Sequence, residues 1–90
     1  MKTYIINGAL QGIGYETLVY FAKKGCNIIA CAHKYSDDFE FNCNKLEVEN
    51  GVSIKRLYCD FNDSNDIKNL ANSIRKLKVE IHGLVNLVGI

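Results

Sequence analysis

A glycine-rich segment directly after a short apolar run constrains this sequence more than any other feature. The run Ile5-Ile6 leads into Asn7-Gly8-Ala9-Leu10-Gln11-Gly12-Ile13-Gly14, whose glycines follow a G-x-x-x-G-x-G spacing. Glycines let a backbone approach a pyrophosphate without a Cβ in the way, and free N–H groups at the start of the next helix attract the anion. The segment predicts a strand, a phosphate-binding turn and a helix. The alternative is an ordinary strand-to-helix turn, since glycine occurs in turns of every kind.

The composition is that of a small globular domain. Of the 90 residues, 48% are hydrophobic and 23% are charged, and the formal net charge is +1. A chain of this length buries roughly 60 to 65% of its unfolded surface, so its core is thin. The charge gives no basic face for nucleic acid, the first glycine turn comes too early for a signal peptide, and no apolar run approaches the ~18 residues of a membrane span. We expect a cytoplasmic protein with neither nucleic acid nor membrane as a partner.

The four cysteines do not form a metal-binding pattern. Cys26, Cys31, Cys43 and Cys59 include no C-x-x-C pair, and no histidine pair completes a zinc set. Cys31 and Cys59 lie inside apolar runs, where a cysteine behaves as a small buried hydrophobe. We expect no metal site and, in a reducing cytosol, no disulfide.

The apolar pattern alternates between strands and helices along the whole chain. Strands are predicted at 3–6, 27–32, 52–59 and 81–88, and helices from about 13 to 24, from 38 to 49 and from Asp63 or Ser64 to 77. The first helix is expected to present one apolar face made of Ile13, Thr17, Leu18, Phe21 and Ala22. The order β-α-β-α-β-α-β implies right-handed crossovers and a parallel, doubly wound α/β sheet.

Three motifs, taken in order, resemble the N-terminal part of the short-chain dehydrogenase/reductases, particularly the members similar to 3-oxoacyl-carrier-protein reductase. The family's T-G-x-x-x-G-x-G loop appears as Asn7–Gly14, the Asp after its third strand as Asp60, and its N-N-A-G motif as Asn86-Leu87-Val88-Gly89. The resemblance covers the whole chain but about the first third of a family member. It implies that residues 1–90 are the N-terminal NAD(P)-binding portion of a Rossmann-type fold. It also implies cofactor contacts at Gly8, Gln11, Gly12, Ile13, Gly14, His33, Lys34, Asp60, Phe61, Asn86 and Gly89.

Several positions depart from the family motifs or have two interpretations. Asn7 replaces the family's Thr, and we expect it to hydrogen-bond locally as Thr would, so that the turn survives. Leu87 and Val88 replace a polar Asn and a small Ala near the place where the family holds the cofactor ribose and nicotinamide. These two side chains either narrow the site or leave it unchanged. Asn86 either contacts the cofactor or ties neighbouring loops together at the strand end.

The end of the second strand bears on the choice between NADP(H) and NAD(H). In NAD-specific sites an acid about 20 residues beyond the glycine motif binds the ribose 2′-OH, whereas a basic side chain accommodates a 2′-phosphate. Here His33 and Lys34 stand in that place, with no acid beside them. The sequence favours NADP(H) over NAD(H), with solvated loop charges as the alternative interpretation. Against this preference, Gln11 stands where many NADP-dependent relatives have a cation.

The sequence offers no catalytic residue. The family's catalytic Ser, Tyr and Lys, and a further Asn, come from segments after the N-N-A-G motif, so none of the tyrosines here is expected to act as the family's catalytic Tyr. One interpretation is the cofactor-binding portion of a reductase that moves hydride between NADP(H) and a carbonyl or alcohol, inactive by itself. The other is a non-catalytic nucleotide-binding or interaction domain, or the product of a decayed gene. In both, an apolar fourth strand at the sheet edge predicts self-association or pairing with a missing C-terminal part.

Overall fold

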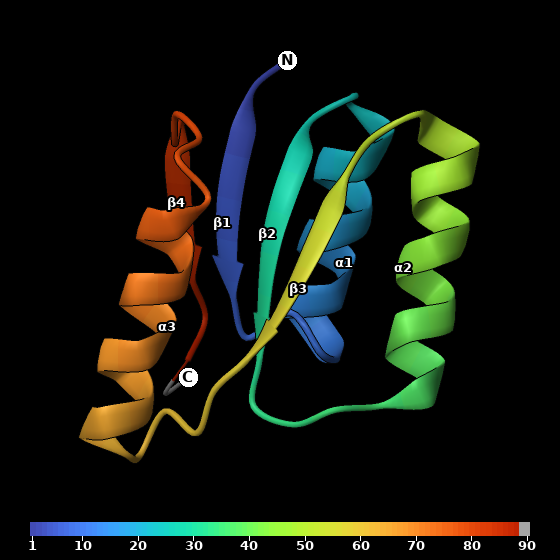
Figure 1. The fold of residues 1–90 in the computed structure, drawn as a ribbon. Helices are drawn as coiled ribbons and strands as arrows, with labels where there is room; N and C mark the ends of the chain where they lie inside the picture. The colour runs from blue at the N-terminus through green and yellow to red at the C-terminus, as the bar shows by residue number, and fades with distance from the viewer. Residues whose placement is uncertain (89–90) are drawn as a thin grey trace.

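The computed structural model describes residues 1–88, in which four strands and three helices alternate along the chain (Figure 1). They are β1 (Thr3–Asn7), α1 (Gly12–Lys23), β2 (Asn27–Ala32), α2 (Asp37–Asn50), β3 (Ile54–Tyr58), α3 (Ser64–Lys76) and β4 (Gly83–Asn86). This order confirms the predicted one. The predicted strands 52–59 and 81–88 extend beyond β3 and β4, because only their central residues pair with a neighbouring strand.

The strands form one parallel sheet in the order β3-β2-β1-β4. β1 is interior, since Ile5 is paired with Ile29 of β2 on one side and with Leu84 of β4 on the other. The chain places β2 and β3 on one side of β1 and then crosses back to place β4 on the other side. Such a reversal of strand order is where open α/β sheets bind ligands, outside the carboxyl ends of the strands. The sheet confirms the predicted doubly wound, Rossmann-like α/β fold.

The core lies between the sheet and the first two helices. α1 and α2 cover one face of the sheet, and α3 lies on the opposite face (Figure 1). Successive side chains of a strand point to opposite faces, so alternate residues of β2 join the core beneath α1 and α2. The fully buried large side chains of this core are Ile6, Leu18, Ile28, Ile54 and Cys43.

One residue of α1 faces away from the core, contrary to the sequence-based prediction. Leu18 and Ala22 are fully buried, as expected, but Ile13 is 70% exposed. Gly14 is the buried residue of the first turn. The first turn of α1 packs on the loop that precedes it rather than on the sheet, so Ile13 lies beside the groove described below.

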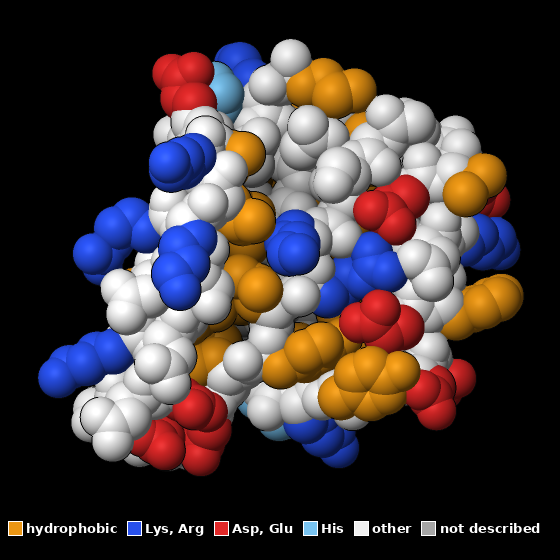
Figure 2. Space-filling view, in the orientation of Figure 1, with side chains coloured by type: hydrophobic (Ala, Val, Ile, Leu, Met, Phe, Trp, Pro, Cys, Tyr) orange, Lys and Arg blue, Asp and Glu red, His pale blue; other side chains and the backbone are white. Residues whose placement is uncertain are grey.

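α3 is capped and amphipathic but only loosely covered. The carboxylate of Asp63 accepts hydrogen bonds from the N–H groups of Asn65 and Asp66 at the helix start. Its apolar residues form a stripe along one face, but no residue of α3 is buried. Figure 2 shows apolar side chains gathered between this helix and the neighbouring strands. The stripe is left partly open because, within residues 1–88, no other element packs closely on α3.

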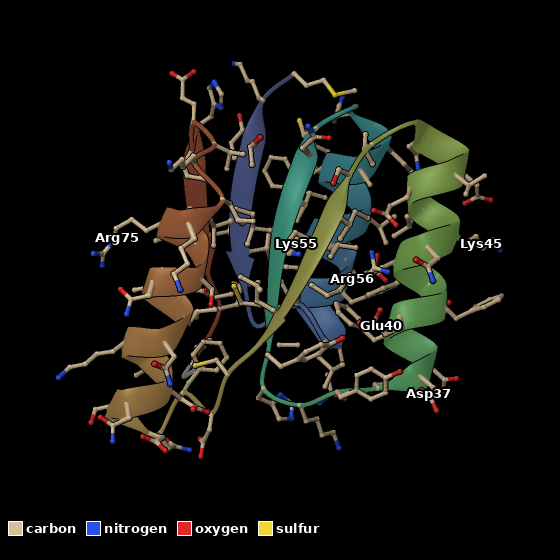
Figure 3. All side chains as sticks on the ribbon, viewed as in Figure 1. Asp37, Glu40, Lys45, Lys55, Arg56 and Arg75 are labelled. Carbon is tan, nitrogen blue, oxygen red and sulfur yellow. The ribbon has the colours of Figure 1, made fainter. Side chains whose placement is uncertain are left out.

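The alternation of β3 directs charged residues to both faces of the sheet. Figure 3 shows Lys55 and Arg56, adjacent in sequence, on opposite sides of the strand. Lys55 is exposed, whereas Arg56 points toward α2 and keeps only 14% of its side chain exposed. A cation buried to this degree needs partners, because removing a charge from water without compensation is costly.

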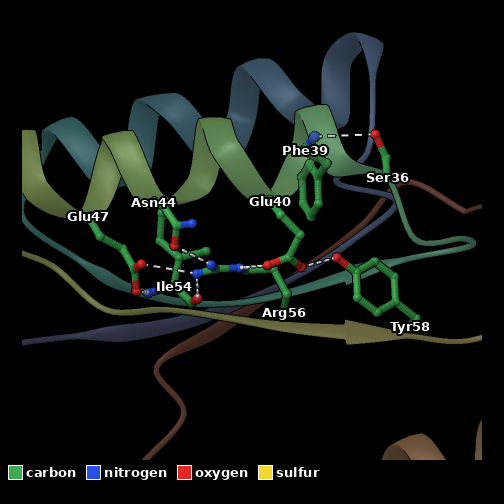
Figure 4. A network of polar contacts seen from close by, with 8 residues as sticks. All are labelled: Ser36, Phe39, Glu40, Asn44, Glu47, Ile54, Arg56 and Tyr58. Atoms are coloured by element: carbon green, nitrogen blue, oxygen red, sulfur yellow. Dashed lines mark hydrogen bonds and ion pairs between the residues drawn. The ribbon is translucent and has the colours of Figure 1, made fainter.

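α2 supplies those partners (Figure 4). Arg56 Nε donates to Glu40 Oε1 at 3.1 Å and Nη1 donates to Glu47 Oε1 at 3.0 Å, while Nη2 donates to Asn44. The Tyr58 hydroxyl donates to the other oxygen of Glu40. This hydrogen bond and the Arg56 guanidinium lower the pKa of Glu40 below its usual range. The network joins α2 to β3.

Candidate functional site

The glycine loop is held by main-chain hydrogen bonds. The N–H groups of Gly8 and Ala9 both donate to the carbonyl oxygen of Cys31, at 2.9 and 3.1 Å, which ties the end of β1 to the end of β2. Gly8 and Gly12 have φ of +84° and +62°, a region that L side chains rarely adopt. The turn therefore forms as predicted. The expectation that Asn7 hydrogen-bonds locally is not met at its side chain, because Asn7 Oδ1 is buried and has no hydrogen-bond partner among the described residues.

Gly14 is required by the contact between α1 and the loop. A Cβ built on Gly14 would lie 1.6 Å from the carbonyl oxygen of Gly8, and one built on Gly8 would lie 3.3 Å from the carbonyl carbon of Leu87. Real Cβ atoms cannot approach backbone as closely as the first distance. The two glycines therefore let the helix, the loop and the residues after β4 meet without side chains between them.

The start of α1 is suited to an anion. The residue before it, Gln11, makes no side-chain capping bond, and the first turn holds no acid. α2 differs, because the N–H of Phe39 donates to Ser36 Oγ at 3.3 Å and acids fill its first turn. Within the described part of the chain, the N–H groups of Gly12 and Ile13 meet no acceptor. Unpaired helix N–H groups with the helix dipole behind them attract phosphate.

Two neighbouring cavities lie at the carboxyl ends of the strands. One, of about 630 Å³, is lined by Gly8, Leu10, Gln11, His33, Asp60, Phe61, Asn62, Leu87 and Val88. The other, of about 210 Å³, is lined by Gly8, Gln11, Ile13, Gly14 and Leu87. Gly8, Gln11 and Leu87 belong to both walls, so the two cavities adjoin each other, and the smaller one borders the start of α1. Together they form a groove across the point where the strand order reverses.

A third cavity separates the two basic residues of the β2–α2 connection. It measures about 510 Å³, and Gln11, Gly12, Lys34 and Ser36 are among its lining residues. Lys34 faces this cavity, whereas His33 lines the 630 Å³ cavity on the other side of Leu10 and Gln11. Both side chains are exposed. The structure therefore brings His33 to the groove and places Lys34 at its margin.

Asp60 and Asn86 have local structural roles in addition to their positions near the groove. Asp60 Oδ1 accepts from the N–H of Asn62 at 3.0 Å, which shapes the turn that lines the larger cavity. Asn86 Oδ1 accepts from the N–H of Val88 at 3.2 Å, and Asn86 is not among the lining residues of the cavities described above. Gly89, also proposed from the sequence, lies outside the described residues.

Sequence reasoning missed Leu10 and Asn62 as lining residues. Leu10 is a variable position of the glycine motif, and Asn62 follows Asp60 and Phe61 in the same turn. Both residues lie next to motif residues, and this proximity was the only signal that the sequence offered. Whether a side chain in a turn faces the groove depends on backbone angles, which the sequence does not specify.

Burial raises the pKa of two weakly acidic side chains near the groove. Burial, together with the nearby Cys59, raises the pKa of the Cys31 thiol to about 12. Tyr15 borders the 510 Å³ cavity, and burial raises the pKa of its hydroxyl above the ordinary value. Among residues 1–88, no three His, Cys, Asp or Glu side chains gather as a metal site would require. No helix in that range is both long enough and apolar enough to span a bilayer.

Tyr20 and Lys24 show Y-x-x-x-K spacing, which is also the spacing of the family's catalytic pair. Tyr20 is 58% exposed, and Lys24 Nζ lies 5.5 Å from the centre of its ring. The pair sits at the C-terminal end of α1, whereas the groove adjoins the N-terminal end. The spacing therefore reflects a surface cation–π contact, and the pair is remote from the groove.

Comparison with known proteins decides the family. A profile described as short chain dehydrogenase matches residues 2–90. This chain belongs to the short-chain dehydrogenase family. It is 26% identical to human polyprenol dehydrogenase over 89 residues, which are 99% of this chain and 27% of that protein. The chain thus spans less than a third of the length of that relative.

Solved structures of family members share the fold. A bulky-bulky ketone specific alcohol dehydrogenase from Comamonas testosteroni superimposes with a TM-score of 0.85 at 26% identity, covering 100% of this chain and 36% of the enzyme. L-sorbose reductase from Gluconobacter frateurii, solved with NADPH and L-sorbose, gives a TM-score of 0.85 at 26% identity, covering 99% of this chain and 34% of the reductase. In both comparisons almost the whole of this chain is aligned, and it corresponds to about a third of the enzyme's length.

Proposed function

We propose that residues 1–90 are the cofactor-binding portion of a short-chain reductase and that the groove binds NADP(H) in preference to NAD(H). The observation that carries this proposal is the start of α1, where uncapped N–H groups adjoin a cavity lined by Gly8 and Gly14. These residues fit a dinucleotide, since the diphosphate would meet the helix start and the adenosine would meet the larger cavity. Bound NADP(H) would supply the hydride.

Each part of the groove has a separate task in this proposal. The N–H groups of Gly12 and Ile13 bind the diphosphate, and Phe61 offers a half-buried ring beside the adenine. His33 and Lys34 would flank a 2′-phosphate from two sides, and both positions at the end of β2 hold a basic residue in place of an acid. The carboxylate of Asp60 borders the same cavity and would accept a hydrogen bond from the adenine amino group.

The same proposal covers partners and location. β4 is paired with β1 alone within the described sheet, and Leu84 is 60% exposed, so this edge is suited to a further strand from a second copy or from a C-terminal part. By itself the chain is proposed to be inactive as a reductase, with hydride transfer to a carbonyl or alcohol belonging to the whole protein. Free cysteines at four positions fit a reducing, cytoplasmic setting.

A calorimetric titration of the purified chain with NADPH and NADH tests the cofactor proposal. We expect saturable binding of both, with NADPH bound about tenfold more tightly, because one charge-assisted hydrogen bond contributes roughly 1.5 kcal/mol. The absence of binding heat and of any rise in melting temperature at millimolar concentrations of either cofactor would contradict it. Equal affinities for NADPH and NADH would agree with the dinucleotide site and contradict the preference for NADP(H).

A further inference from the structure

His82 attaches the start of β4 to β1 through two hydrogen bonds with a single residue. The N–H of His82 donates to the carbonyl oxygen of Thr3 at 2.8 Å, and the N–H of Thr3 donates to His82 Nδ1 at 3.1 Å. Both polar main-chain groups of Thr3 are therefore bonded to the same histidine. The first bond belongs to the backbone and any residue can make it, whereas the second needs the imidazole ring.

The second bond determines the protonation state of the ring. A main-chain N–H can only donate, so Nδ1 must offer a lone pair, and it does so in the neutral imidazole with its proton on Nε2. In the charged imidazolium both ring nitrogens carry a hydrogen. Two N–H groups would then face each other, and the N–H of Thr3 would lose its acceptor. Because histidine changes its charge near about pH 6.5, pH controls this contact.

The charged groups near His82 compensate little for that loss. Glu80 Oε2 lies 3.8 Å from His82 Nε2, but the Glu80 side chain is 85% exposed, and an ion pair that open to water contributes little. Glu80 is the only ion-pair partner of His82 within residues 1–88. The other charged groups on the adjoining segments are all basic, and they disfavour a further positive charge. They are the amino terminus, Lys2, Lys78, and Arg75 and Lys76 at the end of α3.

β4 has few other attachments. It spans the four residues Gly83–Asn86 and, within the described sheet, pairs with β1 alone (Figure 1). Leu87 continues the same segment, donates its N–H to the carbonyl oxygen of Asn7 at 3.0 Å and lines both cavities of the groove. A weaker attachment at the start of β4 therefore acts on a short strand whose other end borders the groove.

We infer that His82 is a pH-dependent latch on β4. The neutral ring accepts the hydrogen bond from Thr3 and holds the strand on β1. As the pH falls through about 6.5, the ring gains a proton, the bond to Thr3 is lost and β4 separates from β1 more readily. The contribution of the latch to stability is thus present above this range and lost below it. The inference goes beyond the proposed function, because it concerns the end of β4 opposite the groove and needs no bound cofactor.

Hydrogen exchange followed by NMR on the full chain, without cofactor, tests the latch. After correction for intrinsic exchange rates, the protection of the Thr3 and Leu87 amides should fall about threefold or more between pH 7.5 and pH 5.5, because each loses the support of one hydrogen bond. The Ile28 amide is the internal reference, since it donates to the carbonyl oxygen of Ser53 between β2 and β3. Its protection should change less than about twofold. Equal changes at all three amides, or constant protection of Thr3, would overturn the inference.

The ring itself provides a second measurement. At about pH 7.5 the nitrogen-15 spectrum of the imidazole should show the proton of His82 on Nε2, because Nδ1 accepts from Thr3. A proton on Nδ1 at that pH would overturn the inference.

Three variants separate the latch from the general effect of acid. His82→Asn keeps an acceptor oxygen close to the place of Nδ1 but does not titrate, so Thr3 should stay protected at both pH values. His82→Ala has no acceptor, and Thr3 should be weakly protected at both. His33→Asn is the matched control, because the chain has two histidines and His33 lies at the end of β2. This control should keep the pH dependence of the parent, and thermal melts verify that each variant folds. A pH dependence that persists in His82→Asn or disappears in His33→Asn would overturn the inference.

Discussion

The carbonyl oxygen of Gly8 lies where a side chain on Gly14 would begin, 1.6 Å from the position of its Cβ. The contact couples two functions of the loop. It lets α1 approach the end of β1, and that approach places the first helical N–H groups beside the groove.

Gly14→Ala should therefore impair folding and binding together. The added methyl group forces the helix away from the loop, with a loss of about 1–3 kcal/mol in the free energy of unfolding and at least a tenfold loss of NADPH affinity. The larger Gly14→Val should abolish binding. Urea denaturation and calorimetry provide the measurements. Gly25→Ala is the control, since Gly25 lies past the other end of α1, with φ of +80° and no atom within 4 Å of a Cβ. Gly25→Ala should lose stability and keep its affinity, and unchanged affinity in folded Gly14→Ala would contradict the role of the loop.

The two basic residues after β2 should differ in their effects on cofactor preference. His33→Ala and Lys34→Ala are each expected to weaken NADPH binding about three- to tenfold and to leave NADH binding nearly unchanged, since exposed charged contacts contribute modestly. Lys45→Ala, an exposed lysine on α2 far from the groove (Figure 3), is the matched control. A double variant that binds both cofactors as the parent does would refute the assignment of the 2′-phosphate position.

The order of elements and the position of the glycine loop could be predicted because they depend on local patterns. β2 follows an uninterrupted apolar run, and its predicted bounds agree with the structure. The second helix, predicted to run from 38 to 49, spans Asp37–Asn50 and is followed by Gly51 with φ of +63°. The burial of Ile13 was predicted wrongly, because helical periodicity does not reveal that the first turn of α1 packs on a loop. The divergence of His33 and Lys34 into separate cavities likewise depends on backbone direction in a connection without periodicity.

The environment of Arg56 could not be predicted, for a different reason. An arginine within a strand indicates a solvated face, yet alternation turns Arg56 toward α2, where Glu40 and Glu47 neutralise it. Those partners are 16 and 9 residues away in sequence. Such a pairing becomes visible only when the packing of α2 against β3 is known.

Stability should depend on pH through Glu40. Because the pKa of Glu40 is lowered by the Tyr58 hydroxyl and by Arg56, its contribution is fully present above the unfolded pKa of about 4.3 and is lost as pH falls through the lower folded pKa. Glu40→Gln should lower the free energy of unfolding by about 1 kcal/mol at pH 7, and the difference from the parent should shrink below pH 4. Urea titrations at several pH values measure it, with exposed Glu49→Gln on the same helix as the control. If the difference in free energy of unfolding between Glu40→Gln and the parent stayed constant down to pH 3, the ionised pair of Glu40 and Arg56 would be contradicted.

The β4 edge should govern association of the isolated chain. Leu84→Lys introduces a charge on an exposed strand that has none, and charged edge residues oppose strand pairing. Sedimentation velocity should show a dimer or aggregate for the parent and a larger monomer fraction for Leu84→Lys. Val48→Lys, on α2 and 85% exposed, is the control for the effect of net charge. A parent chain that sediments as a monomer at all concentrations would count against association through β4.

The atom that holds the glycine loop to β2 belongs to the main chain, because both loop amides donate to the carbonyl oxygen of Cys31. Any small residue at position 31 can supply the same oxygen. During evolution this anchor can therefore survive substitutions of the cysteine, whereas inserting or deleting a single residue in β2 would bring a different carbonyl beneath Gly8. For this part of the site, the structure depends more on the length of β2 than on the identity of residue 31.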